Sequence, residues 1–216
     1  MTPEIVFEDN HVIVAVKPAG ILSQSDGSGA PDILTIIKDY IKVRDNKPGN
    51  VYLGLIHRLD RNVEGIMVFA KTSKAASRLS EQVRNRQVTK RYRAEVMGIL
   101  TPANGKLENY LLKNEKTNIT KVFDKNPGLK DAKLSSLEDR GIENKEFMGK
   151  ATTLVDVKLG TGRSHQIRVQ FAHIGHPLVG DVKYKGPADS GKIRLQSYLI
   201  GFYHPTSKEY MEYKLS

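Results

Sequence analysis

The chain has 216 residues, of which 39% are hydrophobic and 27% charged, so we expect one folded domain over residues 1–216 rather than a disordered chain. An excess of 34 Lys and Arg over 24 Asp and Glu gives a net charge of +10, which favours a nucleic-acid partner. The absence of cysteine excludes disulfides, thiolate nucleophiles and cysteine zinc sites, and no apolar run is long enough to cross a membrane, so we expect a cytoplasmic protein.

In the N-terminal part, four apolar runs predict β-strands, at residues 5–7, 12–16, 51–56 and 66–70. Asp9-Asn10 predicts a tight turn between the first two strands, and Gly65 closes the loop between the last two. From Pro31, apolar residues recur at the spacing of an amphipathic helix, with the proline in its first turn.

Two more helices and further strands follow. Ser73 is the expected N-cap of a helix that ends near Arg84 and buries Ala76, Leu79 and Val83. Ser164 is expected to cap a helix that ends at Gly175, with an apolar stripe of Ile167, Phe171 and Ile174. The segment 104–150 is polar and rich in turn residues, so its strand boundaries cannot be predicted. The remaining strands are expected at residues 91–97, 153–159 and 195–202.

These strands return by hairpins as often as through helices, which favours an α+β fold with a mixed, largely antiparallel sheet. No internal repeat or low-complexity linker is visible. A doubly wound nucleotide-binding fold fits less well, because the single G-x-G at Gly160-Thr161-Gly162 lacks a third glycine and a trailing acidic residue.

Asp60 lies in the predicted loop between two strands, where the neighbouring His57 and Arg58 can hold a carboxylate as an anion. A carboxylate in such a loop can also cap a turn or pair with a surface arginine. His57 is equally compatible with a hydrogen-bonded core histidine. The residues alone therefore leave a catalytic and a structural interpretation open.

A basic segment near the middle of the chain places five cations within ten residues: Arg84, Arg86, Lys90, Arg91 and Arg93. Tyr92 lies among them, an arrangement typical of surfaces that hold phosphates and an exposed base. In strand alternation, Tyr92 points away from Arg91 and Arg93, toward a core or the floor of a cleft. A solvated basic face and a core tyrosine are the alternatives.

The segment Thr161-Gly162-Arg163-Ser164 offers backbone donors and the positive end of a helix dipole to an anion, and Arg168 lies about one turn further along. Three histidines, His165, His173 and His176, lack a recognised metal-site spacing with carboxylates. We therefore expect no metal site.

Taken together, the chain resembles the RluA-type family of RNA pseudouridine synthases, because seven short motifs follow one another in the family's order. H-R-L-D, followed at these intervals by the tyrosine strand and G-R-x-H-Q-I-R, is the most specific part. The seven segments are Lys17-Pro18-Ala19-Gly20, His57-Arg58-Leu59-Asp60, Ala70-Lys71-Thr72, Lys90-Arg91-Tyr92-Arg93-Ala94, Gly162-Arg163-Ser164-His165-Gln166-Ile167-Arg168, Gly175-His176-Pro177-Leu178 and His204-Pro205.

The resemblance implies a sheet with a central active-site cleft, an isomerase that needs no cofactor, and Asp60 as its nucleophile. Asp60 would attack the target uridine, at the sugar or at the base, before the uracil rotates and bonds again through its C5. Tyr92 would stack on the base and help remove the C5 proton, and Arg168 would pair with Asp60 and keep it ionised. Arg58 would fill the gap left by the flipped nucleotide. The other expected substrate-binding residues are His57, Arg163, His165, Arg84, Arg86, Lys90 and Arg91.

One departure concerns the loop after Asp60, where the family usually has Thr-Ser-Gly and this chain has Val63-Glu64-Gly65. The swap removes hydroxyl support from the loop, although Gly65 is expected to preserve the turn and Glu64 can bond loop amides instead. The small RNA-binding domain that some relatives carry is not seen ahead of Lys17, so we expect a stand-alone catalytic domain. Its partner is expected to be ribosomal or transfer RNA rather than DNA, and the protein is expected to be a monomer.

Two other functions compete with isomerisation. A non-catalytic RNA-binding or chaperone domain on the same fold would explain the charge, but Asp60, Tyr92 and Arg168 argue against it. A glycoside-cleaving enzyme would use Asp60 and Glu64 as paired carboxylates and release a free base or sugar.

Overall fold

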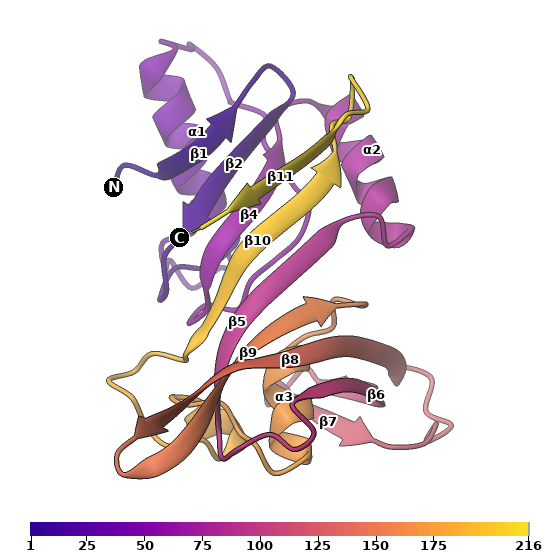
Figure 1. The fold of residues 1–216 in the computed structure, drawn as a ribbon. Coiled ribbons are helices and arrows are strands. Elements are labelled where there is room, and N and C mark those ends of the chain that lie inside the picture. Colours follow the sequence, from indigo (N-terminus) through magenta and orange to yellow (C-terminus); the bar gives the residue numbers. More distant parts are fainter. Residues whose placement is uncertain (216) are drawn as a thin grey trace. The chain divides into compact units, whose positions relative to one another are not determined.

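The computed structural model describes residues 1–215, which divide into two compact units (Figure 1). Unit 1 combines Met1–Lys90 with Ser197–Ser216, and unit 2 is Arg91–Gln196. Each unit contains β-strands and at least one helix. The expectation of a single domain over residues 1–216 stays a prediction. No helix among residues 1–215 has both the length and the apolar composition to cross a bilayer.

Unit 1 is built on a sheet whose neighbouring strands run in the order β1-β2-β4-β10, with β11 paired to β10 and β3 to β4. Two helices, α1 and α2, lie beside these strands (Figure 1). The strands are β1 (Glu4–Glu8), β2 (Val12–Lys17), β3 (Gly54–Leu55), β4 (Glu64–Ala70), β10 (Leu195–Tyr203) and β11 (Tyr210–Lys214). The helices are α1 (Ile33–Arg44) and α2 (Ser73–Arg84). Its core includes Val14, Val68, Leu79 and Phe202, which are 0% exposed.

The predicted turn between β1 and β2 is confirmed, and its cause is local. The Asp9 carboxylate accepts hydrogen bonds from the backbone N–H groups of His11 and Val12, each at 2.7 Å. Asp9 therefore closes the antiparallel hairpin through an Asx turn. The predicted strand over residues 51–56 is mostly wrong, because only Gly54 and Leu55 pair with the end of β4.

The helix boundaries differ from prediction by one or two residues at their N-termini. Asp32 caps α1, so Pro31 lies before the cap rather than in the first turn. Thr72 caps α2 through a bond from the Ala75 N–H, so Ser73 is the first helical residue. The predicted inner face of α2 does pack on the core: Leu79 is buried, and Ala76 and Val83 are half-buried against the same cluster, together with the buried Ala75.

Unit 2 is an antiparallel sheet with strands in the order β5-β9-β8-β6-β7. Its strands are β5 (Thr89–Met97), β6 (Asn104–Asn114), β7 (Ile119–Phe123), β8 (Lys133–Phe147) and β9 (Lys150–Leu159). Helix α3 (Gln166–His173) packs on β6 and β7, followed by the short 3-10 helix η1 (Val182–Tyr184) (Figure 1). The segment 104–150, for which no boundaries were predicted, thus supplies three strands.

Helix α3 differs from prediction at both ends. Its N-cap is His165, in a left-handed conformation and with no capping side-chain bond, so Ser164 is not the cap. Gly175, with φ +85°, ends the helix as predicted. Ile174 is 42% exposed and does not extend the buried stripe of Ile167 and Phe171, because it lies after the last helical turn.

Candidate active site

Asp60 lies at the tip of the loop that connects β3 to β4 in unit 1, where it is half-buried. Its carbonyl accepts a hydrogen bond from the Val63 N–H at 3.1 Å, which folds the loop back toward β4. The side chain of Val63 is 2% exposed, so it packs into the interior. It has no hydroxyl that could bond the loop backbone, so polar support for the loop comes from other side chains.

Ser23 supports the residue immediately before Asp60. Its hydroxyl donates to the carbonyl of Leu59 at 2.8 Å and accepts from the N–H of Leu59 at 2.9 Å. Ser23 and Leu59 are both buried, so these two bonds are shielded from water. One side chain thus satisfies both backbone groups of the residue next to the proposed nucleophile.

Lys17 supports the residue after Asp60. Its ammonium, which is 0% exposed, donates to the carbonyls of Pro18 at 2.9 Å, Ile21 at 2.8 Å and Arg61 at 3.1 Å. The Gly20 N–H also donates to the Arg61 carbonyl, at 2.8 Å. The K-P-A-G motif therefore ties its own turn to the Asp60 loop with all three N–H groups of one buried lysine.

Burial lowers the pKa of Lys17 to about 8, although the nearby carboxylates of Asp60 and Glu64 raise it part of the way back. Near neutral pH the group is therefore mainly an ammonium, and its charge lies within electrostatic range of Asp60. Together with Ser23 it forms a clamp on both sides of Asp60, which we call the loop clamp. The loop clamp supports the backbone of this loop without a hydroxyl at positions 63 and 64.

Gly65 is required where β4 begins. Its φ is +140°, and a Cβ at this position would come within 2.3 Å of the Ser197 carbonyl oxygen. Lys17 and Gly65 are paired across β2 and β4, so this close approach also fixes the end of the Asp60 loop. The expectation that Gly65 preserves the local backbone therefore has a steric basis.

The two residues at the start of the H-R-L-D motif have different surroundings. The His57 Nε2 accepts from the Val68 N–H at 3.3 Å, and burial lowers the pKa of His57 to about 3, with a smaller effect of the Lys90 charge. Its Nδ1 is buried and has no hydrogen-bond partner among residues 1–215. Arg58 is exposed. His57 is thus a neutral ring fixed to β4, while Arg58 is accessible to a ligand.

Tyr92 belongs to unit 2 and lies on β5 opposite Val157 of β9. It is 6% exposed and shares its face of the strand with Ala94 and Val96, which are 0% exposed. The predicted alternation is confirmed, since Arg91 and Arg93 on the other face are half-buried rather than buried. Tyr92 therefore lies on the buried face of β5.

The five predicted strip residues do not form one uniform surface. Arg84 and Arg86 are exposed in unit 1, whereas burial lowers the pKa of Lys90. In unit 2 Arg91 pairs with Asp156, whose side chain is 3% exposed, and the Arg91 Nε lies 3.2 Å from its Oδ1. Only Arg84 and Arg86 are fully exposed, while Arg91 is committed to a structural ion pair.

Arg168 is held on α3 by a bidentate ion pair. Its Nε and Nη2 donate to the two carboxylate oxygens of Asp181 at 2.7 and 2.8 Å, and both side chains are buried. The guanidinium also lies 5.2 Å from the centre of the Tyr184 ring. Asp181 and Tyr184 therefore fix the direction of Arg168. The expected pairing of Arg168 with Asp60 joins residues of the two units and stays a prediction.

The helix start that was predicted to bind an anion is partly occupied by side chains. The Arg163 N–H donates to the Gln166 side-chain oxygen at 3.1 Å, and the Arg163 Nε donates to the Leu134 carbonyl at 3.3 Å. His165 is buried, and its Nδ1 lies 2.7 Å from the Tyr184 hydroxyl. The Thr120 N–H donates to the same hydroxyl, so His165 and Tyr184 form one network below α3.

His173 and His176, the other two histidines considered as metal ligands, each bind a different partner. The His173 Nε2 lies 2.8 Å from the Asp124 carboxylate, and the His176 Nδ1 lies 2.7 Å from the Met97 carbonyl. With His165 bound to Tyr184, the three rings are engaged separately.

Four residues with clear structural roles in these sites received none from the sequence: Lys17, Ser23, Asp181 and Tyr184. A signal existed for Lys17, because it continues the buried face of Ile13 and Ala15 in strand alternation. Nothing near Ser23 in the sequence indicates that its hydroxyl reaches Leu59, which is 36 residues away. Asp181 and Tyr184 lie beyond the quoted motifs, where short polar and aromatic residues have many possible partners.

Both the sequence and the fold of this chain match known proteins. A sequence profile described as RNA pseudouridylate synthase matches residues 11–173. The chain belongs to this family. It is 31% identical over 98% of its length to an uncharacterized RNA pseudouridine synthase of Aquifex aeolicus, and 33% identical over 97% to the ribosomal large subunit pseudouridine synthase D of Yersinia pestis. It spans 68% and 66% of these two proteins, about two thirds of their length.

The fold of this pseudouridylate synthase family member also matches a solved structure, human RNA pseudouridylate synthase domain containing 4. The TM-score is 0.79 and the identity 19%, over 99% of this chain and 88% of the human one. The likeness confirms the α+β class and the largely antiparallel strands. The expected active-site cleft stays a prediction. Pseudouridylate synthases are isomerases that act on RNA, which agrees with the chain's positive charge.

Proposed function

We propose that this chain isomerises uridine to pseudouridine within RNA and that Asp60 is its nucleophile. The observation that carries the proposal is the loop clamp, which fixes the backbone on both sides of Asp60 with a buried lysine and a buried serine. Fixing a catalytic group before the substrate arrives lowers the entropy cost of the reaction. A carboxylate that merely caps a surface turn would gain nothing from so much buried support.

The reaction that we propose is balanced without a redox partner. Asp60 forms a covalent bond to the uridine, the bond between C1′ and N1 breaks, and the uracil rotates while it remains in the site. A bond then forms between C1′ and C5, and the bond to Asp60 breaks, which regenerates the carboxylate. The C5 proton leaves to a base, for which we propose Tyr92, and N1 takes up one proton, so the product is an isomer of the substrate. Because no electrons are gained or lost, the reaction needs no redox cofactor.

Arg168 and Arg58 take the remaining roles in this proposal. Arg168, whose direction is set by Asp181, would stabilise the Asp60 carboxylate while substrate excludes water. Arg58 is exposed and would fill the space of the flipped nucleotide, which offsets an unstacking cost of roughly a few kcal/mol. His57, Arg163 and His165 would act by holding the loop and helix that carry these groups. Lys90 and Arg91 would act in the same way, because Lys90 is half-buried and Arg91 is paired with Asp156.

We further propose ribosomal RNA as the substrate, in the cytoplasm. The support is the Yersinia pestis relative, which is named a ribosomal large subunit pseudouridine synthase. Transfer RNA is the second candidate, and the two candidates are distinguished by which RNA pool accepts the modification. Arg84 and Arg86, the exposed members of the basic segment, would contact the phosphates of the substrate RNA.

The test is tritium release from RNA labelled at C5 of uridine, with RNA from a strain that lacks this protein. Wild type should release tritium from ribosomal RNA, while Asp60→Ala should release none and still bind RNA. Asp60→Asn is the matched control for shape. Turnover by Asp60→Ala would remove Asp60 from the mechanism, and free uracil in place of pseudouridine would indicate glycoside cleavage. RNA binding by wild type without release would favour the non-catalytic alternative.

A further inference from the structure

Unit 2 carries two cavities that the roles above do not use. The first, of about 420 Å³, lies beside α3 and has apolar walls that include Val122, Val169, Ala172 and Pro177. His173, Lys183 and Lys185 also line it. Its size falls within the range of about 300–1,000 Å³ that small-molecule sites in proteins occupy. It is therefore large enough for a nucleobase.

The second cavity, of about 440 Å³, lies next to the turn between β8 and β9. Its apolar walls include Met97, Phe147, Met148 and Pro187, and its cations are Lys150 and Lys185. Because Lys185 lines both cavities, the two are neighbours on one surface of unit 2. We call them the paired cavities.

The residues that line the paired cavities include cations but no carboxylate. Lys150 and Lys185 are exposed and form no ion pair within residues 1–215. Acidic groups also lie near the cavities: Asp124 pairs with His173 of the first cavity, Glu146 is exposed two residues before Met148, and Asp189 and Glu95 pair with Arg194. The lining residues themselves thus combine apolar walls with three lysines, Lys150, Lys183 and Lys185.

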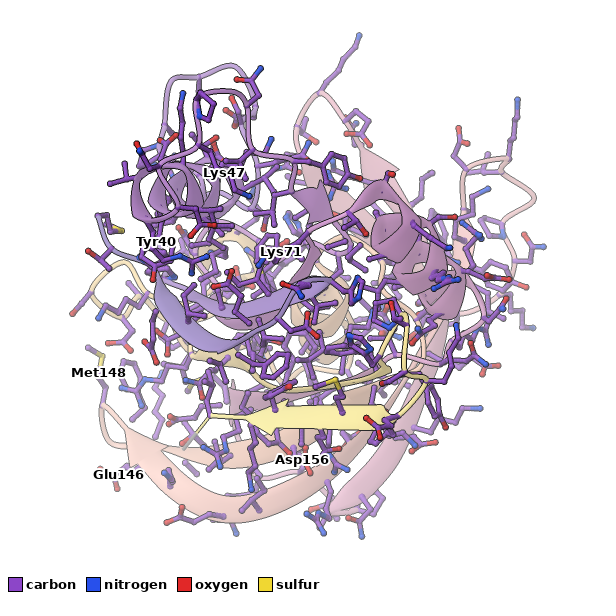
Figure 2. The ribbon with its side chains drawn as sticks, turned by 90° about the horizontal axis from the view of Figure 1, so that it is seen from above. Tyr40, Lys47, Lys71, Glu146, Met148 and Asp156 are labelled. Atoms are coloured by element: carbon purple, nitrogen blue, oxygen red, sulfur yellow. The ribbon has the colours of Figure 1, made fainter. Side chains whose placement is uncertain are left out.

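Two of the lining residues have unusual backbone conformations. Met148 has a φ of +49° in the two-residue turn between Phe147 and Lys150, where Asn, Asp or Gly is preferred. Figure 2 shows Met148 beside Glu146 at the end of this hairpin, and the methionine is 77% exposed. Lys185 has a φ of +68° after η1. The turn therefore exposes a large apolar side chain at the edge of the second cavity, at a backbone conformation that a smaller polar residue adopts more easily.

We propose that the paired cavities bind two unpaired nucleotides of the substrate RNA, apart from the uridine that is modified. Bases would contact the apolar walls, including the Met148 side chain, while Lys150 and Lys185 would contact the phosphates. This inference rests on the proposed RNA substrate. Such a subsite would select RNA with a single-stranded segment near the target.

The chemistry of the cavities favours RNA over a protein partner. Lysines at the edges of apolar walls match a chain that alternates phosphates with flat, sequence-tolerant bases. An A-form duplex presents its bases stacked and paired, so it could not insert them into either cavity. Unpaired nucleotides therefore fit both the shape and the charge.

The first experiment compares Lys150→Gln/Lys185→Gln with wild type in binding to a short oligouridine single strand at several salt concentrations. Affinity should fall on the order of tenfold, and the slope of log K against log salt should decrease by about 1.4, since each phosphate contact on a single strand contributes about 0.7. The matched control is Lys121→Gln/Lys130→Gln, which removes two exposed lysines of unit 2 outside the cavities. Lys121 points away from Val122 on β7, and the control should keep the wild-type slope.

The second experiment tests Met148→Asn, which places a preferred residue in the strained turn. Its melting temperature should stay the same or rise, while oligouridine affinity should fall, a combination that a purely structural methionine would not give. Cross-linking with 4-thiouridine RNA should attach residues 147–150 or 183–187. Equal binding by the double variant and its control, no wild-type binding to oligouridine, or cross-links only elsewhere would overturn the proposal. Binding that depends on Lys150 and Lys185 without tritium release from any RNA would instead refute only the isomerase function.

Discussion

Lys17→Met removes the ammonium of the loop clamp while it keeps a long apolar side chain in the same space. In the wild type the ammonium donates hydrogen bonds to the carbonyls of Pro18, Ile21 and Arg61. The Arg61 carbonyl keeps its bond from the Gly20 N–H. We therefore expect the variant to remove the lysine bond from one buried acceptor, Ile21, and one partly buried acceptor, Pro18, and to loosen the backbone after Asp60.

The two energetic effects of this change oppose each other. The pKa of Lys17 falls from its ordinary 10.5 to about 8, so holding the charge in the folded protein costs about 3 kcal/mol at neutral pH. The variant removes that cost, but each unsatisfied carbonyl costs about 1–3 kcal/mol. The net change in the free energy of unfolding should stay below about 3 kcal/mol. Pseudouridine formation should fall on the order of a hundredfold, because Asp60 is no longer held in place.

The pH dependence separates this account from a general loss of stability. Because the folded pKa lies below the unfolded one, the unfolded state binds more protons between about pH 8 and pH 10.5. Lys17 therefore makes the free energy of unfolding rise with pH there, by up to about 1.4 kcal/mol per pH unit, while catalysis falls as the ammonium loses a proton. Urea unfolding of both proteins from about pH 7 to about pH 9.5 measures this. Parallel curves for wild type and Lys17→Met would refute the reasoning.

Further variants test other contacts. Ser23→Ala should lower the free energy of unfolding by about 1–2 kcal/mol because both bonds to Leu59 are lost. Ser23→Thr, which keeps a hydroxyl, is the control, and urea unfolding measures both variants. An unchanged stability of Ser23→Ala would argue against the loop clamp. Asp181→Asn should lower the free energy of unfolding by about 3 kcal/mol, because it leaves the buried Arg168 poorly paired. The double variant Arg168→Met/Asp181→Asn should regain part of this stability. A double variant less stable than Asp181→Asn would contradict the reasoning. Arg91→Gln should lower the melting temperature because it breaks the pair with Asp156. Arg84→Gln/Arg86→Gln should leave the melting temperature unchanged and weaken RNA binding, and the reverse pattern would exchange the two roles.

Features that depend on local periodicity could be predicted from the sequence. Tyr92 was placed on the buried face of its strand by alternation alone, and its exposure of 6% agrees. The α2 cap was wrong by one residue because Thr72 and Ser73 are both good N-caps, and only the bond to the Ala75 N–H distinguishes them. Local sequence patterns thus predict the type of element and its buried face, but they do not determine the residue at which the element begins or ends.

Features that depend on contacts across the chain could not be predicted. Arg91 and Asp156 are 65 residues apart, and their ion pair follows from the register of β5 on β9, where Asp156 lies opposite Arg93 and diagonal to Arg91. The charge pattern therefore counted Arg91 as an RNA contact. The strands of segment 104–150 were missed for a related reason: few of their side chains are buried, so apolar alternation is weak there.

Unit 1 is discontinuous, because residues 91–196 are inserted between its two parts. Strand β10, which pairs with β4 and β11, is made only after all of unit 2. During synthesis, unit 2 is therefore made before the sheet of unit 1 can close, and the part of β4 that pairs with β10 has no partner strand until then. The Asp60 loop is followed directly by β4, so the proposed nucleophile would reach its final setting only after β10 has been made.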